Sequence, residues 1–100
     1  MKNMFVISCI ARRNILGEVL ENGEWRYACI DDRGPMATGY PTMGFSMYEA
    51  KTFPSIKDAE EWFSHNKKYL FDDRYDYDFG TLAIRKVAFN TKKKLSVRDI

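Results

Sequence analysis

The sequence predicts an α+β fold. An antiparallel sheet of about four strands, an N-terminal meander plus a C-terminal strand, is expected to have one helix packed across a face. Several segments have the alternating side-chain pattern of strands, one has a helix cap and helical spacing of its apolar residues, and breaker-rich stretches separate them. The 100 residues suffice for one hydrophobic core, so we expect a single domain over 1–100 with a basic tail at 91–100.

Three strands are expected to form the N-terminal meander. The first has apolar side chains on both faces, which is typical of a central strand. The second and third flank Asn22-Gly23, and this dipeptide is a strong hairpin signal because both residues tolerate a positive φ. Such a hairpin would place Leu16, Trp25 and Cys29 on one apolar face. The expected elements are a strand over 4–11, a turn over 12–14, and paired strands over 15–21 and 24–31.

One helix is expected over 56–69. Ser55 can cap its first amides, and Asp58 follows three residues later as in a capping box. The apolar stripe that should face the sheet includes Ala59, Trp62 and Phe63. The only histidine, His65, lies one position off that stripe and is expected to be solvated or to cap the helix end.

The remaining segments are predicted from breakers and β propensity. Five glycine and proline residues within 34–44 favour an irregular loop. The alternating aromatic and acidic residues of 69–79 favour a surface segment, because aspartate is poor in both helices and central strands. A strand with a small irregularity is expected over 81–90, a strand-like or irregular stretch over 45–53, and a basic tail that either frays or adds a short strand.

No catalytic, metal or cofactor motif is present in the sequence. Cys9 and Cys29 are isolated, so we expect them to be reduced and buried, and no metal site and no cofactor are expected. The adjacent acids, such as Asp31-Asp32, would point to opposite faces of a strand rather than converge. The chain is therefore predicted not to be an enzyme. Its apolar segments are too short for a signal sequence or a membrane helix, which favours a cytoplasmic location.

The favoured function is protein binding through two candidate surfaces. In the acidic aromatic segment, tyrosines could anchor in pockets of a partner while the aspartates meet basic groups. The alternative for this segment is that its aromatic residues close the core. The glycine- and proline-rich loop could add adaptable contacts. The candidate partner-binding residues are Asp72, Asp73, Tyr75, Asp76, Tyr77 and Asp78 in the segment, and Tyr40 and Met43 in the loop.

Nucleic-acid binding is the alternative function. The C-terminal region holds six basic residues and no acid before Asp99, and such a cluster can neutralise phosphates. It carries only one aromatic residue, Phe89, on which a base could stack. The candidate residues for this function are Arg85, Lys86, Lys92, Lys93, Lys94 and Arg98.

Four stretches carry a resemblance to a known group of proteins: FVISCIARRN, GEVLENGEWRYA, YEAKTFPSIKDAEEWF and LAIRKV. Together they resemble the small accessory proteins of bacteriophages and mobile elements of Firmicutes. The A-K-x-F-x-S passage also occurs in the hybrid-binding domain attached to some ribonucleases H, whose marked hairpin is not matched here. The chain is expected to be a monomer or a homodimer. The phage resemblance implies a small non-enzymatic inhibitor that acts in the bacterial cytoplasm on a host protein. CRISPR effectors and other nucleic-acid-binding defence proteins are the partners that it implies.

Overall fold

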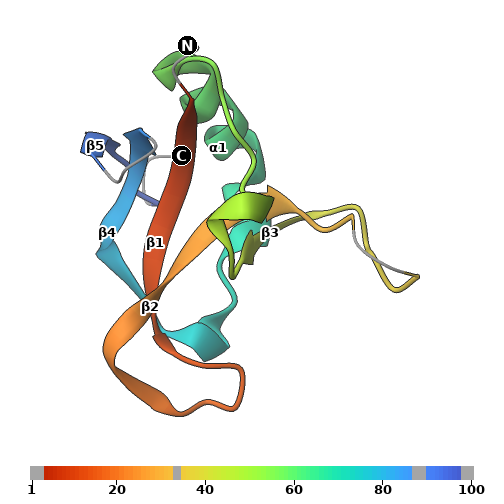
Figure 1. Cartoon of the computed structure of the whole chain (residues 1–100), viewed down its shortest axis with the longest axis vertical. Helices are drawn as coiled ribbons and strands as arrows, with labels where there is room; N and C mark the ends of the chain where they lie inside the picture. Colours follow the sequence, from red (N-terminus) through yellow and green to blue (C-terminus); the bar gives the residue numbers. More distant parts are fainter. Residues whose placement is uncertain (1–3, 33–34, 87–89, 98–100) are drawn as a thin grey trace.

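The computed structural model describes residues 4–32, 35–86 and 90–97. It confirms the α+β class: one antiparallel sheet with the strand order β3-β2-β1-β4-β5 and one α-helix across a face (Figure 1). The sheet has five strands rather than about four. The elements are β1 (Phe5–Arg13), β2 (Val19–Ile30), β3 (Pro41–Gly44), α1 (Ile56–Leu70), β4 (Tyr77–Lys86) and β5 (Asn90–Lys94), with 3₁₀ turns η1 (Met47–Glu49) and η2 (Asp73–Tyr75).

The hairpin predicted at Asn22-Gly23 is wrong. The long strand β2 runs through this dipeptide, so the chain reverses earlier, between Asn14 and Glu18. The turn predicted over 12–14 is shifted to these residues because β1 extends to Arg13. The side-chain oxygen of Asn14 accepts hydrogen bonds from the amides of Leu16, at 2.9 Å, and Glu18, at 3.0 Å, and thereby organises this turn.

Gly23 forms a bulge instead of a turn. Its φ is +68°, and the register passes from Ala11 opposite Glu24 to Arg13 opposite Val19, which leaves residues 20–23 of β2 facing Arg12 alone. A Cβ atom at Gly23 would lie 2.3 Å from Cγ2 of Ile10. The Asn-Gly pair does indicate a positive φ, but Gly23 adopts it at a bulge inside β2 and not in a turn.

The helix α1 begins as predicted and extends one residue further. Ser55 is its N-cap, with the side-chain oxygen accepting from the Asp58 amide at 3.1 Å. Ala59 and Phe63 are buried against the sheet, as predicted. Trp62 is only half-buried, at the rim of the core, and its ring lies 5.6 Å from that of Phe53.

The core lies between α1 and the sheet face that it covers. Both cysteines are buried and unpaired, as predicted. Burial, more than the nearby charge of Asp78, raises the pKa of the Cys9 thiol to about 11. The buried side chains of this cluster are Ile7, Cys9, Ala11, Ala28, Met43, Phe53, Ala59, Phe63, Leu70, Tyr77, Leu82 and Ile84.

Two further predicted segments differ from the structure. Residues 41–44, placed in a loop by their glycine and proline, form the edge strand β3, which tolerates Pro41 at its first position. The strand β4 begins at Tyr77, inside the predicted surface segment, because it pairs there with Ala11 of β1. In the tail, β5 is the short strand that one of the two alternatives predicted.

Some predictions fall outside the described residues. These concern Phe89 and Arg98. Within the described part of the chain, no helix is long and apolar enough to cross a membrane.

Candidate functional site

The acidic segment is partly neutralised by two arginine side chains. Asp72 caps η2, and its carboxylate receives two hydrogen bonds from the Arg74 guanidinium, at 2.8 and 3.1 Å, which hold the pKa of Asp72 below its ordinary value. Asp76 and Asp78 both lie near the guanidinium of Arg12, at 3.6 and 3.4 Å. Two arginines therefore offset part of the charge of the four aspartates, and the segment is a weaker acidic surface than the sequence suggests.

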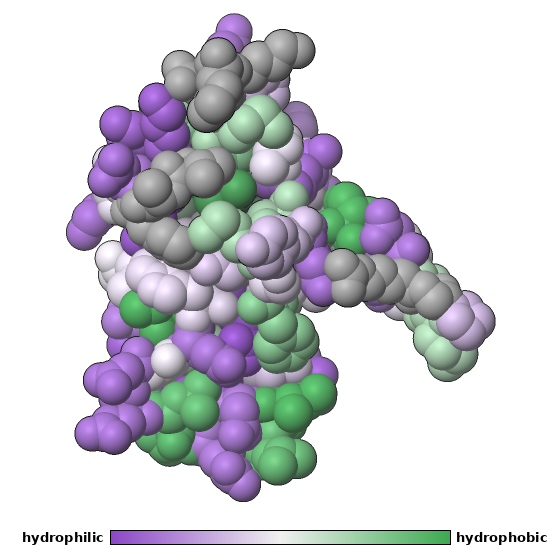
Figure 2. Space-filling view, viewed as in Figure 1, coloured by the Kyte–Doolittle hydropathy of each residue, from purple (hydrophilic) through white to green (hydrophobic). Residues whose placement is uncertain are grey.

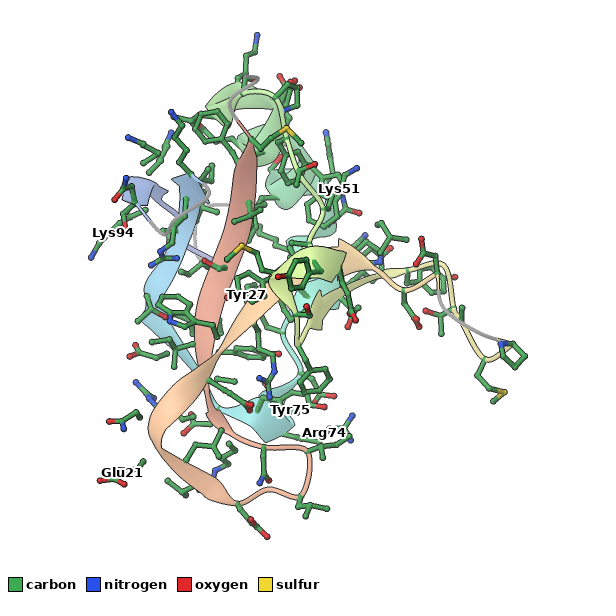
Figure 3. The ribbon with its side chains drawn as sticks, viewed as in Figure 1. Glu21, Tyr27, Lys51, Arg74, Tyr75 and Lys94 are labelled. Atoms are coloured by element: carbon green, nitrogen blue, oxygen red, sulfur yellow. The ribbon has the colours of Figure 1, made fainter. Side chains whose placement is uncertain are left out.

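The tyrosines of the segment turn toward the core. Tyr77 is only 6% exposed, so its prediction as a partner contact is wrong, and burial raises the pKa of its hydroxyl. Its position opposite Ala11 directs the ring onto the helix-covered face. The ring of Phe71 stands edge-to-face against Tyr77 at 5.3 Å and Phe79 at 5.0 Å. Tyr75 is half-buried beside this cluster, and it is labelled with Arg74 in Figure 3.

The two loop residues have different environments. Tyr40 is exposed, as predicted, and its ring lies 5.8 Å from that of Tyr69 at the end of α1. Met43 is 6% exposed because β3 pairs with β2 and turns this side chain into the core, contrary to the prediction of an exposed contact residue.

The basic candidates are also divided by the fold. Arg85 is buried, contrary to the prediction that it could contact phosphates: its guanidinium donates to Ser8 Oγ at 2.8 Å and to the Thr81 carbonyl at 2.6 Å, and it lies 4.5 Å above the Trp25 ring. Lys93 forms an ion pair with Glu60 at 2.6 Å. Lys86 is half-buried, whereas Lys92 and Lys94 are exposed on the edge strand β5, where Lys94 is labelled in Figure 3.

A groove of about 480 Å³ lies between the β2-β3 end of the sheet and η1. We call it the acidic groove, because it is lined by the carboxylates of Asp31, Asp32 and Glu49. Its aromatic wall consists of Phe45 and Tyr48, both exposed. The other lining residues are Cys29, Ile30, Thr42, Met43 and Gly44.

The charges of the three carboxylates act on one thiol that lines the same groove. Burial raises the pKa of Cys29, and the negative charges of Glu49, Asp31 and Asp32 raise it further. Gly44 makes room for this arrangement: a Cβ atom there would lie 2.8 Å from the Cys29 sulfur and 3.4 Å from Oε2 of Glu49. Asp31 also orders the neighbouring loop, since its carboxylate accepts from the amide and hydroxyl of Thr38 at 3.1 and 3.0 Å.

A buried arginine supports the aromatic wall. The Arg26 guanidinium carbon lies 4.2 Å from the ring centre of Phe45, and the Arg26 side chain is only 1% exposed. Phe45 itself is 58% exposed. A fixed cation beneath one face of the ring leaves the other free for contact while restricting the orientation of the ring.

A second exposed apolar surface lies at the β1-β2 turn. Leu16 is 77% exposed, and Ile15 and Val19 are exposed beside it. Figure 2 shows hydrophobic side chains gathered at this lower end of the molecule, interrupted by polar ones. The sequence prediction missed this surface because a hairpin at Asn22-Gly23 would have paired Leu16 with the core.

Sequence reasoning also missed the acidic groove. Its residues come from two stretches, 29–32 and 42–49, that only the β2-β3 pairing and η1 bring together. The one local signal was the Asp31-Asp32 pair, which does not point to residues more than ten positions away. Over the described ranges, no group of three or more His, Cys, Asp and Glu side chains is arranged to hold a metal ion.

Comparisons with protein-family models, with curated proteins and with solved structures found no match to this chain.

Proposed function

We propose that this chain is a small non-enzymatic protein-binding module whose acidic groove receives a basic segment of a partner. The observation that carries the proposal is that two exposed aromatic residues line the same groove as three acidic residues. Aromatic side chains that fill a partner's pocket contribute much of the energy of protein interfaces, and carboxylates around them favour an approaching cation.

The Phe45 ring is suited to be the main contact. Ordering a side chain on binding costs roughly 0.5–1.5 kcal/mol. The Arg26 guanidinium already restricts the orientation of the Phe45 ring in the free protein. Binding therefore has to order this side chain less. The ring also lies at the edge of the groove, so one partner segment can touch it and the carboxylates together.

The sign of the charge selects the partner class. Three carboxylates in the groove repel phosphates and attract lysine or arginine side chains. The resemblance to phage accessory proteins supplies the rest of the proposal: the partner is a host protein, such as a CRISPR-type effector or another defence protein, whose nucleic-acid-binding surface is rich in such side chains.

Nucleic-acid binding remains the second candidate because of β5. Its Lys92 and Lys94 are exposed on an edge of the sheet, and Lys67 of α1 lines a small depression with Lys94. An edge strand also gains from lysines because they prevent unwanted strand pairing, which weakens this candidate.

Capture of partners from a bacterial lysate, with and without nuclease, tests the proposal. Asp32→Asn and Tyr48→Ala should each reduce recovery of one nuclease-resistant protein, since both side chains line the groove and are exposed enough to be dispensable for folding. The matched controls are Glu61→Gln and Leu16→Ala, which remove a charge and an apolar group elsewhere. Recovery that is unchanged in both groove variants would contradict the groove assignment. Loss of recovery after nuclease treatment, together with a loss in the Lys92→Gln and Lys94→Gln variants, would favour nucleic acid.

A further inference from the structure

Arg26 has buried donors without hydrogen bonds. Both terminal nitrogens, Nη1 and Nη2, are inaccessible to solvent and have no hydrogen-bond partner. The other buried arginine, Arg85, donates to Ser8 and Thr81 instead. Buried polar groups of folded proteins nearly always have partners, and an unmet guanidinium is costly, so this exception points to a missing acceptor.

The nearest acceptor is a carboxylate in an imperfect position. Oε2 of Glu24 lies 3.1 Å from Nη1 of Arg26, close enough for an ion pair but without the alignment of a hydrogen bond. The Glu24 side chain is half exposed to solvent, and so is Phe45, which covers the guanidinium. Because the half-exposed Glu24 carboxylate reaches Nη1 from solvent, a second carboxylate can take the same route once Glu24 rotates away.

We propose that Arg26 is a binding site for a carboxylate of the partner protein, which displaces Glu24 while Phe45 stays stacked on the guanidinium. The planar guanidinium offers two parallel N–H groups that match the two oxygens of a carboxylate. Glu24 already shows that a carboxylate can approach from this side. Exchanging one carboxylate for another adds no net charge next to the aromatic cluster of Tyr75 and Phe45, whereas a phosphate would add charge and bulk.

That the carboxylate comes from a partner protein rests on the proposed function. That Arg26 can bind a carboxylate rests only on its buried donors without hydrogen bonds. A segment that binds the acidic groove through its basic residues would pass over Phe45 and bring an acidic side chain or a chain terminus onto Arg26. The partner segment is then expected to be basic with one carboxylate at a fixed distance, which would set its register in the groove.

The test uses small carboxylates and the isolated protein. N-acetylalanine offers only a main-chain carboxylate, and the α-amide of N-acetylglutamic acid offers only a side-chain carboxylate. Titration of either should shift the guanidinium ¹⁵N resonances of Arg26 saturably, whereas sodium chloride at equal ionic strength should not. The probe that binds more tightly identifies the source of the carboxylate, and equal binding means that the site does not discriminate.

Variants separate this proposal from a structural role of Arg26. Glu24→Gln removes the competing carboxylate and should tighten probe binding by about two- to fivefold, as expected for loss of an ion pair whose carboxylate is half exposed. Glu21→Gln is the matched control and should leave the affinity unchanged. A second readout is the ring signals of Phe45, which lies 4.2 Å from the guanidinium and should shift saturably when a probe binds. Arg26→Lys keeps the charge without the paired N–H groups and should abolish this shift. No saturable shift for either probe in the Glu24→Gln protein would overturn the proposal and leave ordered water as the acceptor. Because no partner is present, this failure is distinct from failure of the capture experiment.

Discussion

Substitution of Gly23 by alanine should destabilise the fold far more than a turn glycine would. At φ +68° the left-handed backbone costs an alanine roughly 1–2 kcal/mol. The new Cβ atom would also lie 2.3 Å from Cγ2 of Ile10 and 3.0 Å from the carbonyl oxygen of Ala11. Relief of such overlap by shifting packed strands typically costs roughly 1–3 kcal/mol more. The expected loss in the free energy of unfolding is therefore about 2–5 kcal/mol.

Gly17 provides the matched control for this substitution. Its φ is +80°, but a Cβ atom there would have nothing within 4 Å. Gly17→Ala should therefore cost only the backbone term, about 1–2 kcal/mol. The difference between their losses in the free energy of unfolding measures the cost of the overlap between β2 and β1 at the bulge.

Urea denaturation of the two variants, followed by tryptophan fluorescence, measures this difference. A total stability of roughly 5–15 kcal/mol leaves both variants measurable. If Gly23 were in an exposed hairpin turn, the two substitutions would have equal effects. Equal losses, within about 0.5 kcal/mol, would therefore refute the continuous β2 strand and the argument built on it.

Three further outcomes are expected. Ser55→Ala should lower the free energy of unfolding by about 1 kcal/mol in thermal denaturation, because the Asp58 amide loses its acceptor; a neutral result would mean that water replaces the cap. Arg85→Gln should destabilise the fold by roughly 2–4 kcal/mol, since the bonds to Ser8 and Thr81 and the contact with Trp25 are buried, whereas Lys92→Gln should stay within about 0.5 kcal/mol. Stability should fall as pH rises from 9 toward 11, because the raised pKa of Cys9 keeps this thiol protonated in the folded state after it ionises in the unfolded chain. The loss should approach about 3 kcal/mol and be smaller in Cys9→Ala, and a pH profile that is the same in both proteins would contradict it.

Local signals in the sequence determined the fold class and the helix. Ser55 and Asp58 cap the helix through bonds between residues three positions apart, so neighbouring side chains suffice to locate its start. The burial of Cys9 and Cys29 was predicted from the usual behaviour of isolated cysteines, and the structure confirms it. These predictions needed no knowledge of which strand pairs with which.

Tertiary structure decided the features that depend on pairing across the sheet. Asn22-Gly23 indicates a positive φ, but a turn and a bulge both use it, and the continuation of β1 to Arg13 selects the bulge. Tyr77 alternates with aspartates as a surface residue would, yet its partner Ala11 turns it inward.

The candidate sites depend on contacts between distant residues for the same reason. Arg85 looks like part of a basic cluster, but Ser8, more than seventy positions away, makes it a buried structural residue. The acidic groove exists only because β3 pairs with β2 and places Glu49 beside Gly44 and Cys29. A residue's own type and its sequence neighbours determine its preference for helix, strand or turn. The strand register determines which face of the sheet its side chain occupies and which charged side chains lie beside it.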